Sequence, residues 1–337
     1  MKLLFKQSQK ILLVVIPATL LLAGISSYSS IISHQALFEA CKQRELNTAT
    51  TLIQNTIEEA QTKAAARASI VVNLPSIKEA FRNNDRDRIL DRLLPAFLIQ
   101  RDRYGVAEGQ FHTAPATSFL RIYAPTLGQG EDLSSFREMV VTTNKDHEPR
   151  RGLEIGRRGL SIRGIDVVKD AEGYIGTFEI GLNFLPVLES VKKNTGFELG
   201  AFADEDLMSR IASSVPRPDA ERIISGLRNI ETTDWKTLKS VTTPELLASI
   251  KEISTQIKTI SGIDYGIVLV PLKDYKGLNI GVIVAVQNFE AYQKQMSAAI
   301  VRAISFSLLQ VVVLCGILLM MINVMFVRPV SAKGATQ

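Results

Sequence analysis

Two long stretches without a charged residue constrain this chain most. Residues 11–32 and residues 303–327 are largely apolar and contain no Asp, Glu, Lys or Arg. Each is long enough for an α-helix to cross the hydrocarbon core of a bilayer, which takes roughly 20 residues. The stretches predict two transmembrane helices near the two ends of a chain of 337 residues. Some of their residues are small or polar and favour contacts between membrane helices: Ser26, Ser27, Ser29, Ser30, Gly316 and Asn323.

The charges beside these stretches predict the orientation of the chain. Basic residues lie at both outer ends: Lys2, Lys6, Lys10, Arg328 and Lys333. Positive residues stay on the cytoplasmic side, so we expect both termini inside and residues 34–302 outside. A cleaved signal peptide is the alternative for the first stretch. Its apolar run is longer than the usual core of such a peptide, and no clear A-x-A cleavage site follows it.

The net charge of +5 does not indicate a nucleic-acid partner. The flanking residues just named account for all of it, since the other basic residues balance the 34 acidic ones. A basic stripe is the electrostatic footprint of a nucleic-acid binder, and the external part of this chain is neutral overall. The chain has only two cysteines, Cys41 and Cys315, which exclude a disulfide framework and leave the external part to its hydrophobic core.

Residues 34–72 predict a long helix that continues from the first membrane span. They contain no Gly and no Pro, and small or apolar residues recur at spacings of three and four: Ile53, Ile57, Ala60, Ala64, Ala68 and Val71. Such a heptad-like seam packs either on a second copy of the helix or on the sheet that the helix carries. From the first alternative we expect a parallel homodimer.

Residues 111–179 predict a small sheet with one polar face, interrupted by a helix at residues 133–144 that Asp132 or Ser134 caps. Side chains alternate across a strand with period two. His112 and Gln110 therefore alternate with Phe111, Arg121 shares a face with Phe119 and Tyr123, and Arg163 lies opposite Leu160 and Ile162. The polar side chains form a cup with a cationic lining.

This cup suits an anionic small molecule. Arg offers a planar fork of donors that matches a carboxylate. The alternative is that these arginines are solvated or paired with Glu154 and Glu179 on the wet face of a sheet. The candidate ligand-binding residues are His112, Arg121, Arg163, Phe119, Tyr123, Arg157, Arg158, Arg137 and Glu179.

The pattern then begins again. Residues 185–194 predict a helix, residues 197–203 a strand, residues 218–228 and 244–258 helices, and residues 265–272 and 278–286 a pair of strands. A helix over residues 287–302 leads to the second span. The chain therefore holds two copies of one architecture. The strands of the second copy are almost wholly apolar, which favours a spacer or coupling module over a polar pocket.

The order of membrane helix, long outer helix, two sheets and membrane helix resembles the double Cache ectodomain of bacterial chemoreceptors, sensor kinases and diguanylate cyclases. The segments F-H-T-A-P-A-T-S-F-L-R, D-L-S-S-F-R and G-L-E-I-G-R-R-G-L-S-I-R-G carry the resemblance, which covers roughly residues 35–300. It implies an α+β fold of two tandem PAS-like modules in the bacterial inner membrane with a periplasmic or extracellular ectodomain. It also implies that the membrane-distal module binds a small ligand and that the membrane-proximal module passes the change to the last helix.

The expected segments follow from these arguments. They are a cytoplasmic N-terminus (1–10), a first transmembrane helix (11–33), a long outer helix (34–74), a membrane-distal ligand-binding module (75–195), a membrane-proximal module (196–290), a connecting helix (291–302), a second transmembrane helix (303–327) and a cytoplasmic tail (328–337). Val327-Arg328-Pro329 is similar to the entry of a HAMP linker, but only eight residues follow Pro329. We therefore expect the signal to reach a separate cytoplasmic or membrane partner, or an output domain that this sequence lacks.

An enzyme is the rival class, and the residues give it little support. The histidines His34, His112 and His147 have no metal-ligand spacing, neither cysteine has a base nearby, and there is no G-x-S-x-G motif. We expect no catalytic residues, no metal and no cofactor. We expect contacts with membrane lipid through the two spans. The remaining alternative is a structural or assembly protein of the cell envelope without ligand sensing.

Overall fold

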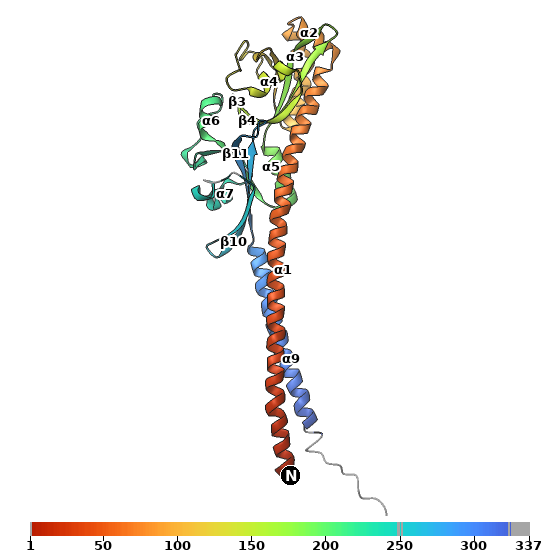
Figure 1. Ribbon diagram of the computed structural model, residues 1–337, viewed down its shortest axis with the longest axis vertical. Helices are drawn as coiled ribbons and strands as arrows, with labels where there is room; N and C mark the ends of the chain where they lie inside the picture. The colour runs from red at the N-terminus through yellow and green to blue at the C-terminus, as the bar shows by residue number, and fades with distance from the viewer. Residues whose placement is uncertain (1, 248–249, 251, 323, 325–337) are drawn as a thin grey trace, which may run out of the picture. The chain divides into compact units, whose positions relative to one another are not determined.

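The structure is a computed structural model that describes residues 2–247, 250, 252–322 and 324. The chain divides into two units. One consists of the residues up to Arg44 together with the chain from Phe289 onward, and the other comprises Glu45–Asn288. The helix α1 (Lys2–Val72) contributes to both units. Figure 1 shows the helices and strands of both units, coloured along the chain.

The first unit contains two helices that are long and apolar enough to cross a membrane. They are Leu13–Val72, the described part of α1 that passes this test, and Glu290–Met321 within α9 (Glu290–Ile322). Ser27 on α1 and Ser307 on α9 join the helices by a hydrogen bond of 2.5 Å between their hydroxyl oxygens. Ser27, expected to contact another membrane helix, thus has a partner in its own chain. Asn323, Arg328 and Lys333 lie outside the described residues, as do the HAMP-like segment and the expected cytoplasmic tail.

The second unit holds two antiparallel sheets. The first has the order β2-β1-β5-β4-β3, and the second the order β7-β8-β6-β11-β10-β9. Apart from the edge strand β7, the strands of the second sheet are β6, β8, β9, β10 and β11 in chain order. Counted from one to five within each module, both sheets have the spatial order 2-1-5-4-3. This confirms two copies of one architecture. The strands are β1 (Val106–Thr113), β2 (Thr117–Arg121), β3 (Arg150–Gly156), β4 (Gly159–Asp170), β5 (Gly173–Leu182), β6 (Glu198–Asp204), β7 (Ile223–Ile224), β8 (Leu227–Thr232), β9 (Ser254–Ile260), β10 (Ile263–Lys273) and β11 (Asn279–Asn288).

The helices of this unit connect and cover the strands. They are α2 (Pro75–Arg82), α3 (Arg86–Tyr104), α4 (Glu138–Asp146), α5 (Leu185–Thr195), α6 (Glu205–Ile211), α7 (Trp235–Val241), α8 (Pro244–Leu247) and the short 3-10 helix η1 (Ala220–Arg222). The predicted helix at residues 133–144 begins later, at Glu138, because Asp132 accepts hydrogen bonds from the amide and hydroxyl of Ser134 and forms a local turn instead.

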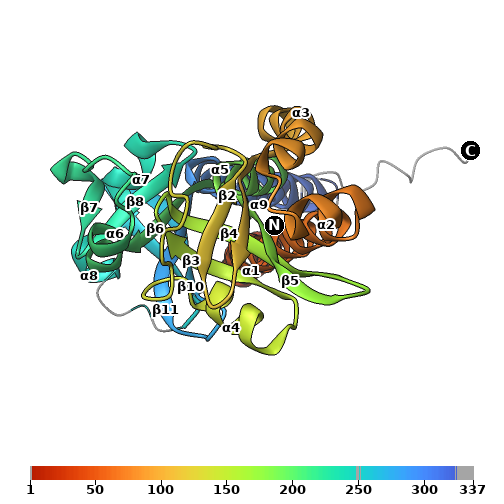
Figure 2. The same ribbon diagram turned by 90° about the horizontal axis from the view of Figure 1, so that it is seen from above.

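The first-module sheet has helices on both faces, as the view from above shows (Figure 2). On one face, Gly164 on β4 approaches α1 so closely that a Cβ there would lie 2.1 Å from the backbone nitrogen of Ala65. On the other face, Ile165 packs with Met139 and Val140 of α4 in one buried cluster. Neighbouring residues of β4 therefore contact helices on opposite sides, as the period of two requires.

The seam predicted on the long helix is buried in the chain's own body. Ile53 and Ala60 are 1% and 6% exposed, and Ala64 and Ala68 are fully buried. The alternative in which the seam packs on the chain's own sheets is therefore correct, and a dimer interface made by this seam is wrong because a second copy cannot reach these side chains. At the end of the helix, Val72 rather than Val71 is buried.

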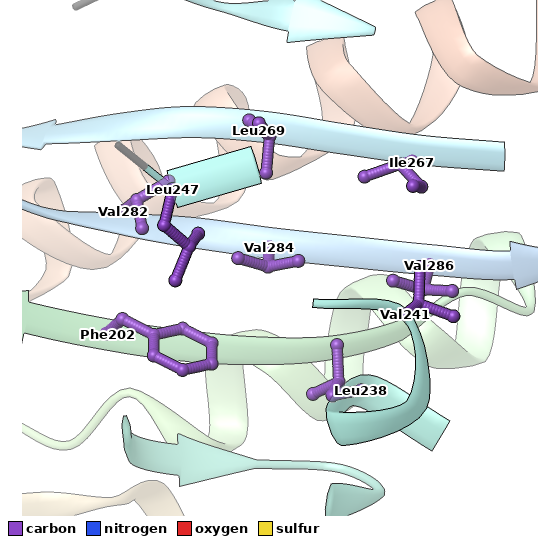
Figure 3. Close-up of a cluster of buried hydrophobic side chains, with 9 residues drawn as sticks. All are labelled: Phe202, Leu238, Val241, Leu247, Ile267, Leu269, Val282, Val284 and Val286. Carbon is purple, nitrogen blue, oxygen red and sulfur yellow. The ribbon is translucent and has the colours of Figure 1, made fainter. Parts of the chain in front are cut away.

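The second module has an apolar core between its sheet and the helices α7 and α8. Nine side chains from β6, β10, β11 and these two helices form it: Phe202, Leu238, Val241, Leu247, Ile267, Leu269, Val282, Val284 and Val286 (Figure 3). The almost wholly apolar strands read from the sequence thus serve a hydrophobic core.

Two predicted helices of the second module are wrong. Residues 218–228 form η1, β7 and the start of β8, while Pro244–Leu247 form only the short helix α8 and residues 254–258 belong to β9. A Ser-Gly pair makes a tight hairpin turn within the first range and just after the second, with φ of 51° and 76° at Ser225 and Gly226 and of 52° and 82° at Ser261 and Gly262. Two successive residues with positive φ match the right-handed twist of paired strands. These turns favour hairpins over helices.

Candidate functional site in the first module

One face of the first-module sheet carries a buried polar layer. Its side chains come from alternate positions on four strands: Glu108, Gln110, His112, Glu154, Ser161, Arg163, Thr177 and Glu179. This layer lies on the face of the sheet that α4 covers. Along β4, Gly164 faces α1, so Arg163 and Ile165 on either side of it face α4. The predicted polar face exists, but it is an interior face and not a wet one.

Arg163 lies at the centre of this layer and is fully buried. Its Nη1 is 2.6 Å from Oε1 of Glu179, and its Nη2 is 3.0 Å from Oε1 of Glu108. Ser161 donates its hydroxyl to the same Glu108 oxygen at 2.8 Å. The guanidinium is thus held by two carboxylates of the protein itself.

Arg137, just before α4, closes the network from above the sheet. Its Nε donates to Glu154 Oε2 at 2.7 Å, and its Nη2 donates to Glu179. The other oxygen of Glu154 accepts from the amide of Met139 at 2.9 Å, which ties the first turn of α4 to β3. Burial by itself lowers the pKa of Arg137, but Glu179 and Glu154 outweigh it and raise that pKa overall. The inner network therefore consists of Arg137, Arg163, Glu108, Glu154 and Glu179.

The predicted cationic lining is wrong for Arg137 and Arg163, because three carboxylates neutralise them. Burial tends to raise the pKa of Glu179, but Arg137 and Arg163 lower it further, to about 2. The alternative in which the arginines pair with Glu154 and Glu179 is the correct one here, although in the core and not in solvent. Glu108 was missed, yet it continues the alternation of Gln110 and His112 along β1.

His112 is the least satisfied member of the polar layer. Its Nδ1 lies 3.2 Å from Oγ1 of Thr177, while its buried Nε2 has no hydrogen-bond partner in the described part of the chain. Asn144 of α4 contacts the same Thr177 hydroxyl at 3.5 Å. Burial lowers the pKa of His112 to about 3, so the ring is neutral at physiological pH.

Acidification should therefore destabilise the protein first through His112 and, at lower pH, also through Glu179. The unfolded chain binds the His112 proton near pH 6.5, whereas the folded state binds it only near 3, so the stability from neutral His112 is complete above 6.5 and is lost below it. We expect the free energy of unfolding to fall by up to about 1.4 kcal/mol per pH unit from this group. Glu179, with its pKa lowered from 4.5 to about 2, adds a second loss below pH 4.5.

Urea unfolding at several pH values checks this expectation. In the variant His112→Asn, the free energy of unfolding should fall less steeply with decreasing pH between 6.5 and 4.5, by the contribution of up to about 1.4 kcal/mol per pH unit that His112 makes in the wild type. The variant His147→Asn is the matched control, because that ring is exposed and stacked on Tyr174. Equal slopes in the wild type and His112→Asn would contradict the prediction.

A second cluster lies at the edge of the polar layer, and we name it the Glu131 cluster. It consists of Glu131, Arg121, Arg157, Arg158, Tyr123 and Phe136. Glu131 bridges two guanidinium groups, at 2.5 Å from Arg121 Nη2 and 2.7 Å from Arg157 Nε. The loop before it folds onto Arg121, since a Cβ at Gly128, where φ is 70°, would lie 2.1 Å from Nη1.

Aromatic rings hold the other arginines of this cluster. The guanidinium of Arg157 lies 4.1 Å from the centre of the Phe136 ring, and that of Arg158 lies 5.0 Å from the Tyr123 ring. Burial raises the pKa of Tyr123 to about 12, so its hydroxyl keeps its proton. The side chains of Arg157 and Glu131 remain 29% and 25% exposed. Unlike the inner network, this cluster is open to solvent.

Phe119 does not belong to either cluster. The register of β1 and β2 shifts between Phe111 and His112, so that Ser118 and not Phe119 lies opposite His112. Phe119 instead packs on Phe81 of α2, with ring centres 4.8 Å apart. The prediction that Phe119 shares a face with Arg121 is wrong, because a bulge inserts one extra residue and turns the following side chain over.

These features, two PAS-like sheets in series and a polar layer in the first, agree with a comparison against family models. The model described as the double sensory domain of two-component sensor kinase matches residues 42–292. The chain belongs to this double Cache family. Membership confirms the predicted resemblance and places the chain among sensory domains. Double Cache proteins of this kind take part in signal transduction.

Solved sensory domains resemble this double Cache chain at low identity. The periplasmic domain of Vibrio cholerae LuxQ aligns with a TM-score of 0.48 at 9% identity, over 72% of this chain and 99% of that one. The sensory domain of the Campylobacter jejuni chemoreceptor Tlp3 with isoleucine bound gives 0.45 at 10% identity, over 80% and 98%. The sensor domain of the V. cholerae histidine kinase DctB gives 0.40 at 10% identity, over 75% and 98%.

A search of the curated proteins found no match. Within the described ranges of this double Cache chain, no group of three or more His, Cys, Asp or Glu residues is placed to hold a metal ion.

Proposed function

We propose that this protein is a membrane-anchored sensor whose first module binds a small carboxylate at the Glu131 cluster. The observation that carries the proposal is the bridge of Glu131 to Arg121 and Arg157. One protein carboxylate occupies two guanidinium forks at a partly open edge of the buried polar layer. A ligand carboxylate matches the same forks and is able to take the place of Glu131.

Two unsatisfied polar atoms support this proposal, one in the Glu131 cluster and one in the adjoining buried polar layer. Arg121 Nε and His112 Nε2 are buried and lack hydrogen-bond partners among the described residues. Leaving such atoms unpaired costs about 1–3 kcal/mol each, and a ligand or water that bonds to them removes this cost. Arg121, Arg157, Arg158, Tyr123 and His112 are therefore the proposed ligand residues. Arg163, Arg137 and Glu179 shape the floor without offering free charge.

Binding experiments on Glu131 and Arg121 test the proposal because they should change affinity in opposite directions. The full chain in lipid nanodiscs is screened by thermal shift with a panel of mono-, di- and tricarboxylates and amino acids. For the best carboxylate, Arg121→Gln should weaken binding by at least about tenfold, since it removes a charged hydrogen-bond donor. Glu131→Gln should tighten binding, because the competing internal carboxylate is gone.

Either of two results would overturn this assignment. Affinity unchanged by Arg121→Gln would place the ligand elsewhere. Weaker binding in Glu131→Gln would mean that Glu131 positions the ligand and does not compete with it. If no compound of the panel binds, the protein fits an envelope structural role better than a sensory one.

We further propose that Tyr275 carries the signal from the first module to the second. It lies in the turn between β10 and β11, and its hydroxyl is 3.0 Å from Thr142 Oγ1 and donates to the Glu138 carbonyl at 3.3 Å. The neighbouring Lys276 is 2.8 Å from the Glu138 carboxylate. Both contacts reach the first turns of α4, the helix that Met139 ties to the inner network. In the chain, β11 leads into α9 and thus into the second apolar segment, so the signal would leave through the membrane helices to a separate partner.

Replacing Tyr275 should separate binding from relay. In Tyr275→Ala we expect ligand affinity within about twofold of the wild type, because the residue lies outside the ligand cluster, and loss of the ligand-induced change in β11. Hydrogen exchange of residues 279–288 with and without ligand measures this change. Lys273→Ala, at the end of the same strand pair, serves as the control and should keep it. A ligand-induced change that persists in Tyr275→Ala would exclude this route.

A further inference from the structure

The face of the first-module sheet that α1 and α3 cover contains a cavity that the Glu131 cluster does not use. It has a volume of about 200 Å³ and lies between α1, α3 and the strands β1 and β5. Its walls are almost entirely apolar, with side chains such as Val71, Leu93, Phe97, Ile122 and Phe178. An apolar cavity of roughly 150 Å³ in a protein stays dry and holds a benzene molecule. This cavity thus has room for a slightly larger apolar body.

The rim of the cavity carries one positive charge. Arg67 on α1 donates from Nε to Gln100 Oε1 on α3 at 3.0 Å, and this hydrogen bond joins the two helices at the cavity. In the described part of the chain, no carboxylate forms an ion pair with Arg67, and the centre of the Tyr104 ring lies 6.0 Å from its guanidinium carbon. The side chain is partly buried, and burial lowers its pKa, which means that its charge lacks full compensation. A guanidinium in this state favours an anion.

We propose that this cavity binds a small amphipathic carboxylate, with an aromatic or short alkyl body inside and the carboxylate on Arg67. The apolar walls supply the affinity of the body through area removed from water. Arg67 keeps Gln100 as a partner through Nε and offers its two terminal nitrogens to the carboxylate. This site is separate from the Glu131 cluster because it lies on the opposite face of the sheet.

The position of the cavity gives its occupant access to the inner network. Phe178 and Ile180 line it from β5, and the residue between them is Glu179, which points to the other face and pairs with Arg163 and Arg137. A molecule packed on Phe178 and Ile180 therefore contacts β5, the strand that carries Glu179. The sheet is the only layer between this site and the polar layer at that point.

Fluorine NMR on the full chain in lipid nanodiscs tests the proposal. The probes are 4-fluorophenylacetate and its neutral analogue 2-(4-fluorophenyl)ethanol, and empty nanodiscs correct for partition into lipid. We expect saturable binding of the carboxylate. Arg67→Gln should weaken the carboxylate about tenfold, because one charge-assisted contact is lost, and should change the alcohol less than about twofold.

Two matched helix variants locate the site. Ala96 lies exposed at the rim of the cavity, so Ala96→Phe should block it and abolish binding of both probes without disturbing the core. Ala66 is also exposed but does not line the cavity, and Ala66→Phe should leave binding unchanged. Three results would overturn the proposal: no saturable binding above that of empty nanodiscs, binding that survives Ala96→Phe, or an equal effect of Arg67→Gln on both probes.

Discussion

Replacing Arg163 by Leu should lower the free energy of unfolding by about 3–5 kcal/mol, the usual cost of breaking a buried ion pair from one side. Arg163 is fully buried and is the cation nearest to Glu108, at 3.0 Å. Without it, Glu108 keeps the Ser161 hydroxyl and Glu179 keeps Arg137, so one carboxylate remains buried without a close cation. The main effect of this change is on folding, and a loss of ligand binding would follow from it.

Chemical denaturation of the full chain followed by circular dichroism measures this effect. The control is Arg158→Leu, an exposed arginine near the start of β4, which should cost less than about 1 kcal/mol through its contact with Tyr123. The double variant Glu108→Leu/Arg163→Leu should recover more than about 1 kcal/mol, since apolar pairs often replace buried ion pairs without loss. A small loss in Arg163→Leu, comparable to that in Arg158→Leu, would show that the inner network is not essential to the fold.

Adding one methyl group at Gly164 should have an effect of similar size. A Cβ there would lie 2.1 Å from the nitrogen and 2.4 Å from the Cα of Ala65. Both atoms belong to the backbone of α1, so no side-chain rotation relieves the overlap and the helix must move away from the sheet. We expect Gly164→Ala to cost at least about 3 kcal/mol, at the upper end of overpacking.

Hydrogen exchange should place this loss in α1 and β4. Amides in the part of α1 opposite Gly164 should exchange faster, because the helix loses its closest contact with the sheet. Gly109→Ala is the matched control: its Cβ would face Phe97 at 3.4 Å, an ordinary contact, and stability should change by no more than about 1 kcal/mol. If both variants behave alike, the approach of α1 to Gly164 is looser than described.

The sequence was most informative where one physical rule dominates. The uncharged stretches, the seam of the long helix and the strands of residues 265–286 follow from apolar patterning, and each has its counterpart in the structure. The second module shows where patterning fails. The turns at Ser225-Gly226 and Ser261-Gly262 depend on backbone dihedral angles, and positive φ at a serine leaves no trace in apolar periodicity.

The candidate site shows a different limit. Alternation predicted that Arg163 and His112 leave the apolar side of their strands, and they do. For Arg163 it offered Glu154 and Glu179 only as an alternative and missed Glu108, since these carboxylates come from three strands other than β4 whose order depends on the whole fold. The bulge that turns Phe119 away is equally non-local, because it arises from the pairing of β1 with β2.

The close approach of α1 to Gly164 also sets where recombination between relatives can succeed. A breakpoint at residue 75 would transplant the first sheet without Ala64 and Ala65, against which Gly164 is fitted. The transplanted sheet would then pack against a helix from the other protein, which is not fitted to Gly164. Productive crossovers should carry the helix from about Glu45 onward together with the sheet, so the unit to exchange includes a helix that a module boundary at residue 75 leaves out.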